Sequence, residues 1–165
     1  NLKQMAAALQ YLKEHRLFEY DDLAAKTDAA TEQFHTLAGD IQQTEAELSR
    51  VSDLMAAVVQ YAKTRPVFDG YKAARYSRKY LAEHEAELAD YRAAKVMMGE
   101  LLGGEKLPKM AELKEKRRQL AARKKALYLE YRKAQQDMRE LVAVKGSVDH
   151  LRGLTDNQRN KEQAR

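Results

Sequence analysis

Two segments of the sequence place side chains that could contact the phosphates or bases of a nucleic acid. The first, residues 71–80, holds three of the nine tyrosines and four basic residues. Tyr76 and Tyr80 are i, i+4 neighbours and would share a helix face with Lys72 and Lys79. Aromatic rings with interleaved cations can stack bases and neutralise the backbone of a single strand. Alternatively, these rings cover a corner of the fold near Phe68. The candidate binding residues here are Lys72, Arg75, Tyr76, Arg78, Lys79 and Tyr80.

The second segment, residues 114–125, carries seven basic side chains against one acid, Glu115. On a helix, Arg118, Lys125 and Arg132 recur every seven residues and form one outward stripe. Such a stripe could follow phosphates, with an affinity that falls as salt rises. The alternative is a solvated face, or a partner for an acidic helix elsewhere in the chain. The candidate binding residues of this part are Lys114, Arg117, Arg118, Arg123, Lys124, Lys125 and Arg132.

Catalytic and metal-binding patterns are weak by comparison. The chain has no cysteine, and none of its four histidines has a partner at a metal-ligand spacing such as i, i+4. His84 with Glu85 and Glu87 could bind a metal in principle, but a solvated histidine at the edge of the seam is the favoured interpretation. There is no phosphate-binding glycine loop and no nucleophile motif. We therefore expect no active site, no metal, no cofactor and no small-molecule ligand.

The composition predicts long helices. One third of the 165 residues are charged, 44% are hydrophobic, and only seven glycines and two prolines interrupt the chain. This balance is typical of coiled coils and argues against a β sandwich or barrel. No apolar run approaches the length of a membrane span. Residues 1–66 carry 7 basic and 10 acidic side chains, whereas residues 67–165 carry 23 and 15, so the net charge changes from −3 to +8.

Breaks at residues 65–70 and 103–108, each containing glycine and proline, divide the chain. We predict an all-α fold: an elongated antiparallel coiled coil of three long helices plus a short N-terminal helix. Residues 1–18 would form the short helix. Residues 19–152 would form the coiled-coil rod, with helices at about 20–64, 70–102 and 109–152 and a reversal of direction at each break. Residues 153–165 would be a polar, frayed tail.

Apolar residues spaced alternately by three and four positions support this prediction. The seam of the third segment is poorer, since it includes His84 and Lys95. The seam of the second segment is Leu23, Thr27, Ala30, Phe34, Leu37, Ile41, Thr44, Leu48, Val51, Met55, Val58 and Ala62. The seam of the last segment is Met110, Leu113, Arg117, Leu120, Lys124, Leu127, Tyr131, Ala134, Met138, Leu141, Lys145 and Val148.

Several segments together resemble the C-terminal helical region of relaxase/mobilization nucleases, which are carried by conjugative and mobilizable elements of gut Firmicutes. They cover nearly the whole chain in order, with the proline breaks between them. The matching segments are residues 11–16 (YLKEHR), 20–23 (YDDL), 63–72 (KTRPVFDGYK), 106–108 (KLP), 127–132 (LYLEYR) and 144–151 (VKGSVDHL).

The resemblance implies a parent enzyme that nicks plasmid or transposon DNA through a tyrosine and a histidine-held metal in an N-terminal domain. This chain lacks the histidine cluster, so we expect a piece of a longer protein without the nuclease. The implied role is a cytoplasmic, non-catalytic accessory region that assists DNA binding and relaxosome assembly during conjugation. Its partners would be DNA, its own nuclease domain, and relaxosome or secretion-coupling proteins, with a possible homodimer and no membrane. The alternative is a purely structural coiled-coil spacer or a protein-interaction module.

Overall fold

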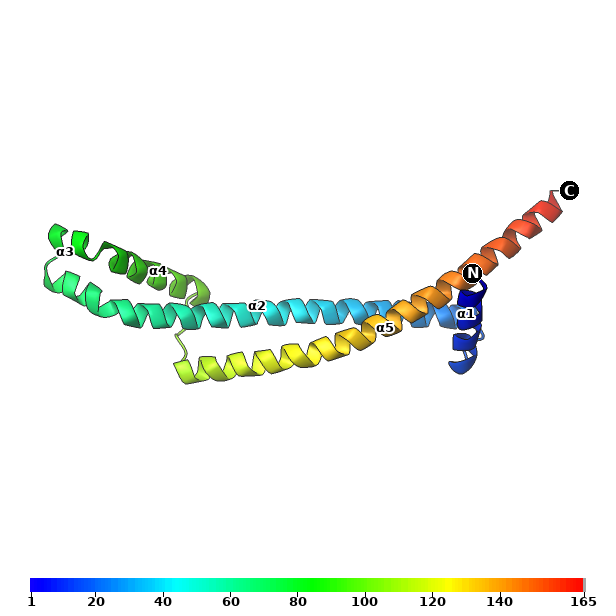
Figure 1. The fold of residues 1–165 in the computed structure, drawn as a ribbon, viewed down its shortest axis with the longest axis horizontal. Helices are drawn as coiled ribbons and strands as arrows, with labels where there is room; N and C mark the ends of the chain where they lie inside the picture. The colour runs from blue at the N-terminus through cyan, green and yellow to red at the C-terminus, as the bar shows by residue number, and fades with distance from the viewer. Residues whose placement is uncertain (165) are drawn as a thin grey trace. The chain divides into compact units, whose positions relative to one another are not determined.

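The computed structural model describes residues 1–164 and contains only helices and their connections over that range, which confirms the predicted all-α class (Figure 1). The chain forms two compact units. Unit 1 comprises residues 1–41 and 125 onward, and unit 2 comprises residues 42–124. Two of the helices contribute to both units. The five helices are α1 (Leu2–Glu14), α2 (Tyr20–Ala73), α3 (Arg78–Glu83), α4 (Glu85–Leu102) and α5 (Met110–Gln163).

Local hydrogen bonds delimit α1. The Asn1 side chain caps the first turn by accepting a backbone N–H at 2.9 Å. At the other end, the amides of Arg16 and Leu17 donate to the carbonyls of Lys13 and Leu12 at 3.3 and 2.9 Å. This pair of bonds closes a helix through one left-handed residue, usually glycine. Arg16 takes that position with φ of 54°, so α1 ends without a glycine.

The predicted break at Pro66 is absent, because α2 continues through this proline to Ala73. Proline cannot donate to the carbonyl four residues earlier, that of Ala62. Both Pro66 and Ala62 are exposed, so water can solvate the carbonyl that loses its partner. Side chains on other faces of this stretch, including buried Thr64 and Tyr71, pack inward. Packing therefore retains the helix where the local sequence predicts its end.

The chain turns instead at residues 74–77, where no glycine or proline is present. Arg75 and Tyr76 adopt left-handed backbone with φ of 54° and 58°. The Arg75 amide donates to Lys72 at 3.0 Å and the Tyr76 amide to Tyr71 at 3.0 Å, which is the same closing pattern as in α1. Ser77 then caps α3. The single helix predicted for residues 70–102 is thus the end of α2, the turn, α3 and α4.

The last two boundaries are simpler. α4 ends at Gly103, whose φ of 56° suits a residue without a side chain. α5 starts at Met110 and continues to Gln163, so residues 153–163 of the predicted frayed tail are helical. Residue 165 of that tail lies outside the described residues.

In unit 1, α2 and α5 run antiparallel. The rings of Phe34 and Tyr131 stack at 5.0 Å, and the hydroxyl of Tyr20 donates to Asp149 at 2.6 Å. Residue numbers therefore rise along one helix as they fall along the other. The core cluster of this unit joins α1, α2 and α5 through Ala8, Leu23, Leu141 and Val144.

In unit 2, α2 packs through two neighbouring seams, one against α5 and one against α4. The predicted seam faces α5, and its last member, Ala62, is exposed. The second seam, which sequence analysis missed, meets α4: Tyr91 stacks on Tyr61 at 5.1 Å and on Phe68 at 4.3 Å. The members of the second seam are Leu54, Ala57, Tyr61, Thr64, Phe68 and Tyr71, all buried or half-buried and again spaced by three and four.

These contacts correct the predicted chain path. The Arg50 guanidinium donates to the Leu101 carbonyl at 2.7 Å, whereas Phe68 lies on Tyr91, so α4 is antiparallel to α2. The start of α5 is also antiparallel to α2, because Lys124 pairs with Glu45 at 3.7 Å and Leu113 belongs to the cluster around Met55. In unit 2, α4 and the start of α5 therefore follow one another along α2 in the same direction (Figure 1). The segment around Pro108 does not reverse the chain.

Candidate nucleic-acid interface

The cations of α5 within unit 2 form the first part of the candidate interface, which we call the basic segment (residues 114–124). The sequence placed two of its members, Arg117 and Lys124, on the seam. In the structure Arg117 is exposed, whereas Lys124 is half-buried against α2. The exposed members are Lys114, Lys116, Arg117, Arg118 and Arg123. The helix thus directs most of this charge to solvent.

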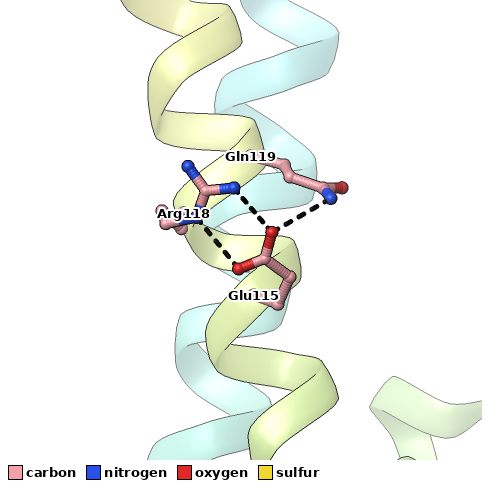
Figure 2. A network of polar contacts seen from close by, with 3 residues as sticks. All are labelled: Glu115, Arg118 and Gln119. Atoms are coloured by element: carbon pink, nitrogen blue, oxygen red, sulfur yellow. Dashed lines mark hydrogen bonds and ion pairs between the residues drawn. The ribbon is translucent and has the colours of Figure 1, made fainter.

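Arg118 is already engaged within its own helix (Figure 2). Its guanidinium donates two hydrogen bonds to the Glu115 carboxylate, at 2.9 and 2.6 Å, and the amide of Gln119 donates a third at 3.3 Å. The hydrogen bonds from Arg118 are the main reason why the pKa of Glu115 is lowered, and the same contact raises the pKa of Arg118. The one acid of the segment therefore neutralises one cation.

The structure addresses the alternative that the basic segment pairs with acidic α2. Among the described residues, Lys124–Glu45 is the one ion pair between α2 and this segment. Within the same range, Lys114, Lys116, Arg117 and Arg123 make no ion pair. Charge complementarity with α2 thus accounts for one cation, and four remain available to an external anion.

The other two residues of the predicted α5 stripe belong to unit 1. Lys125 and Arg132 are both exposed there. The charge of the two units differs. Unit 2 has 17 basic and 12 acidic side chains, whereas unit 1 has 13 of each, so the whole net charge of +5 resides in unit 2. The split at residue 66 separates net charges of −3 and +8, so it divides the charge more sharply than the boundary between the units, which separates 0 from +5.

The second part of the candidate interface, the corner cluster, surrounds the turn between α2 and α3 in unit 2. Its basic members are Lys72, Arg75, Arg78 and Lys79, all of which are exposed. None of these four makes an ion pair among the described residues. The sequence placed two of them, Lys72 and Lys79, on one helix face, but the turn at residues 74–77 distributes the four over α2, the turn and α3.

The three tyrosines of the corner cluster have different roles. Tyr71 is buried. Tyr80 is half-buried, donates its hydroxyl to the Val67 carbonyl at 2.7 Å, and stacks on Tyr71 at 5.9 Å. Tyr76 is 58% exposed and meets Tyr71 edge-on at 5.2 Å. The predicted i, i+4 face of Tyr76 and Tyr80 does not form, because Tyr76 lies in the turn.

Two of the histidines contact tyrosine rings. His15 stacks on Tyr11 at 4.0 Å, and His84 contacts the Tyr80 ring at 4.2 Å between α3 and α4. Over residues 1–164, no three His, Cys, Asp or Glu side chains gather as a metal site would require. In the same range, no helix combines the length and apolar character needed to cross a membrane.

Sequence analysis missed two features of unit 1 that depend on residues far apart in the chain. A groove of about 450 Å³ separates α1 from α5, with Met5, Tyr11 and Gly146 among its lining residues. Burial, followed by nearby Glu140, raises the pKa of Tyr11 in this groove. The second feature involves Arg152, which follows the lining residues of α5 in the sequence. Its guanidinium lies 3.7 Å from the centre of the Tyr20 ring. The spacing of residues along the sequence predicts neither feature.

Comparisons with protein families, with curated proteins and with solved structures found no match to this chain.

Proposed function

We propose that this chain is a non-catalytic nucleic-acid-binding region whose basic segment contacts phosphates. The observation that carries the proposal is a set of four exposed cations that make no ion pair in the described part of the chain: Lys114, Lys116, Arg117 and Arg123. Clustered cations displace the counterions condensed on a nucleic acid, and this release drives binding that is independent of sequence. The location of the entire net charge in unit 2 supports the same conclusion.

The setting we propose is the one that the sequence resemblance implies. The chain would be an accessory region of a DNA-nicking relaxase that works in the cytoplasm during conjugative transfer. It would hold transferred DNA near the nuclease domain and assist relaxosome assembly. This setting rests on the matching segments alone, whereas phosphate binding rests on the exposed cations.

The fold we propose for this role is an antiparallel coiled coil of α2 with α5, extended by α4 on the second seam of α2. The three-four spacing of buried residues on α2 supports it. The same spacing favours the second candidate function, a structural spacer or protein-interaction module, because a long seam serves either purpose. The two functions differ in whether the exposed cations matter.

Binding of a labelled nucleic acid, measured by fluorescence anisotropy at several salt concentrations, tests the proposal. The variant Lys116→Gln, Arg117→Gln and Arg123→Gln removes three unpaired cations from the basic segment. We expect weaker binding to every sequence, and the slope of log K against log salt should fall by about one per residue. A matched control, Arg139→Gln, Arg159→Gln and Lys161→Gln, removes three exposed cations of α5 in unit 1.

Equal loss in both triple variants would show that only net charge matters and would contradict a site in the basic segment. No binding by the unmodified chain at low salt would refute nucleic-acid binding and leave the spacer function as the better explanation.

A further inference from the structure

The corner cluster exposes one aromatic ring among four cations that make no ion pair within the described residues, although Lys72 lies over the Phe68 ring at 6.0 Å. The backbone that presents the exposed ring is strained. Arg75 and Tyr76 are consecutive non-glycine residues in the left-handed region. Left-handed backbone is unfavourable for a residue with a side chain, because its Cβ comes too close to the following carbonyl oxygen. The helix end of α1 closes in the same way with only one left-handed residue, Arg16. Strain of this kind gathers at functional sites.

The hydrogen bonds of the turn fix where the Tyr76 ring lies. The Tyr76 amide is held by the Tyr71 carbonyl at 3.0 Å, and Ser77 starts the next helix directly afterwards. The ring meets Tyr71 at an interplanar angle of 86°. A perpendicular contact of this kind covers at most one face of a ring, and Tyr76 remains 58% exposed. Tyr76 is thus anchored through its backbone while its side chain keeps open surface.

The other tyrosines of the corner explain why Tyr76 can stay exposed. The packing between α2 and α3 is completed by Tyr71, which is buried, and by Tyr80, whose hydroxyl is bonded to Val67. Tyr76 contributes an edge contact to Tyr71 and leaves 58% of its surface exposed.

We infer that Tyr76 is a base-stacking residue and that the corner cluster binds an unpaired nucleotide of the nucleic acid. This inference rests on the proposed function and adds the kind of strand that the corner selects. The ring would stack on one base, and Lys72, Arg75, Arg78 and Lys79 would neutralise the phosphates around it. Bases inside a duplex are already stacked on each other, so only a base outside a duplex is available to a protein ring.

The corner cluster and the basic segment both belong to unit 2, and they lie beside different stretches of α2. The basic segment lies opposite residues near 50, and the corner cluster follows residue 73, a separation of about 35 Å at 1.5 Å per residue. One site would therefore supply general affinity for phosphates, and the other would select for an unpaired base.

Two fluorescent 12-mers of equal charge test the inference: a thymidine strand and a strand of abasic sites. We expect the chain to bind the thymidine strand roughly 5- to 150-fold more tightly, the range for stacking one base. Tyr76→Asn should remove that preference and leave affinity for the abasic strand unchanged, since asparagine tolerates left-handed backbone. Tyr76→Phe should keep the preference. The control Phe18→Asn removes an exposed ring of unit 1, and it should also keep the preference.

The two proposals fail differently. Equal binding of both strands by the unmodified chain, or a base preference that survives Tyr76→Asn, would overturn the stacking site while phosphate binding stands. Absence of binding to either strand would overturn both. Loss of the preference in Tyr76→Phe, with helicity by circular dichroism unchanged, would also contradict stacking, because phenylalanine retains the ring.

Discussion

At the scale of single residues, charge and backbone conformation decide which side chains are available to a ligand. Arg118 and Arg117 are adjacent and both exposed, yet only Arg118 is bound to a carboxylate. Glu115 therefore acts as an internal competitor for the anion that the basic segment would bind. Its lowered pKa means that the carboxylate is ionised, and the contact is complete, above its ordinary pKa range. The contact is lost as the pH falls through the lowered value.

Glu115→Gln should strengthen nucleic-acid binding by about three- to tenfold at low salt, because it removes a negative charge and releases Arg118. The gain should shrink as salt is raised, and anisotropy titrations at two salt concentrations would measure it. Glu112→Gln, which removes an exposed acid one turn earlier, is the control and should have the smaller effect. Unchanged affinity in Glu115→Gln would contradict a role for Arg118 in the interface.

At the scale of helices, the seam of α2 could be predicted from the sequence but its interruptions could not. Positions from Leu23 to Val58 are buried or half-buried as their spacing predicts. The turn at Arg75 and Tyr76 could not be predicted, because no glycine, proline or asparagine marks it. The helix through Pro66 could not be predicted either, since it depends on α4 packing against the second seam.

In the candidate site, too, the features that depend on packing between helices could not be predicted. Helical spacing predicted the outward position of Arg118, because that depends on one helix, but it placed Arg117 on the seam, where the structure leaves Arg117 exposed. The different exposure of Tyr71, Tyr76 and Tyr80 could not be predicted, because it depends on how α3 packs against α2. The Tyr20–Asp149 contact joins residues 129 positions apart and likewise has no local signal.

Gly70 tests how closely α3 approaches α2. A methyl group on Gly70 would overlap the Tyr80 hydroxyl, whereas one on Gly39, in the same helix, would meet nothing. Alanine favours a helix over glycine, so Gly39→Ala should raise the free energy of unfolding by about 0.5–1 kcal/mol. Gly70→Ala should lower it by about 1 kcal/mol, because the bond from Tyr80 to Val67 must break. Urea denaturation followed by circular dichroism would measure both changes.

An equal increase in the two glycine variants would contradict the close approach of Tyr80. Tyr80→Leu provides a further check: in that background, Gly70→Ala should become stabilising, as Gly39→Ala is.

At the scale of the whole chain, two units with separate core clusters share two helices. Leu54 belongs to the cluster of unit 2 and Leu141 to that of unit 1, and each is 2% exposed. Replacing either with alanine should destabilise the protein by about 2–5 kcal/mol. Because each cluster is local, we expect the two losses to appear in different parts of the chain.

Amide hydrogen exchange would resolve the two effects. Leu54→Ala should accelerate exchange chiefly in residues 42–124, and Leu141→Ala chiefly in residues 1–41 and beyond 124. The same pattern of acceleration in both variants would show that the two units open as one cooperative body.

The connection between α4 and α5 has a consequence for how the chain tolerates damage. Residues 103–107 are exposed, and they join two helices that both lie against α2 in the same direction. Each of those helices makes its own contacts with α2, so the position of each along α2 does not depend on the connection between them. We therefore expect the piece that contains α5 to stay bound to the piece that contains α2 after a protease cut at Gly104. The linker is therefore where an inserted tag or domain should disturb the fold least.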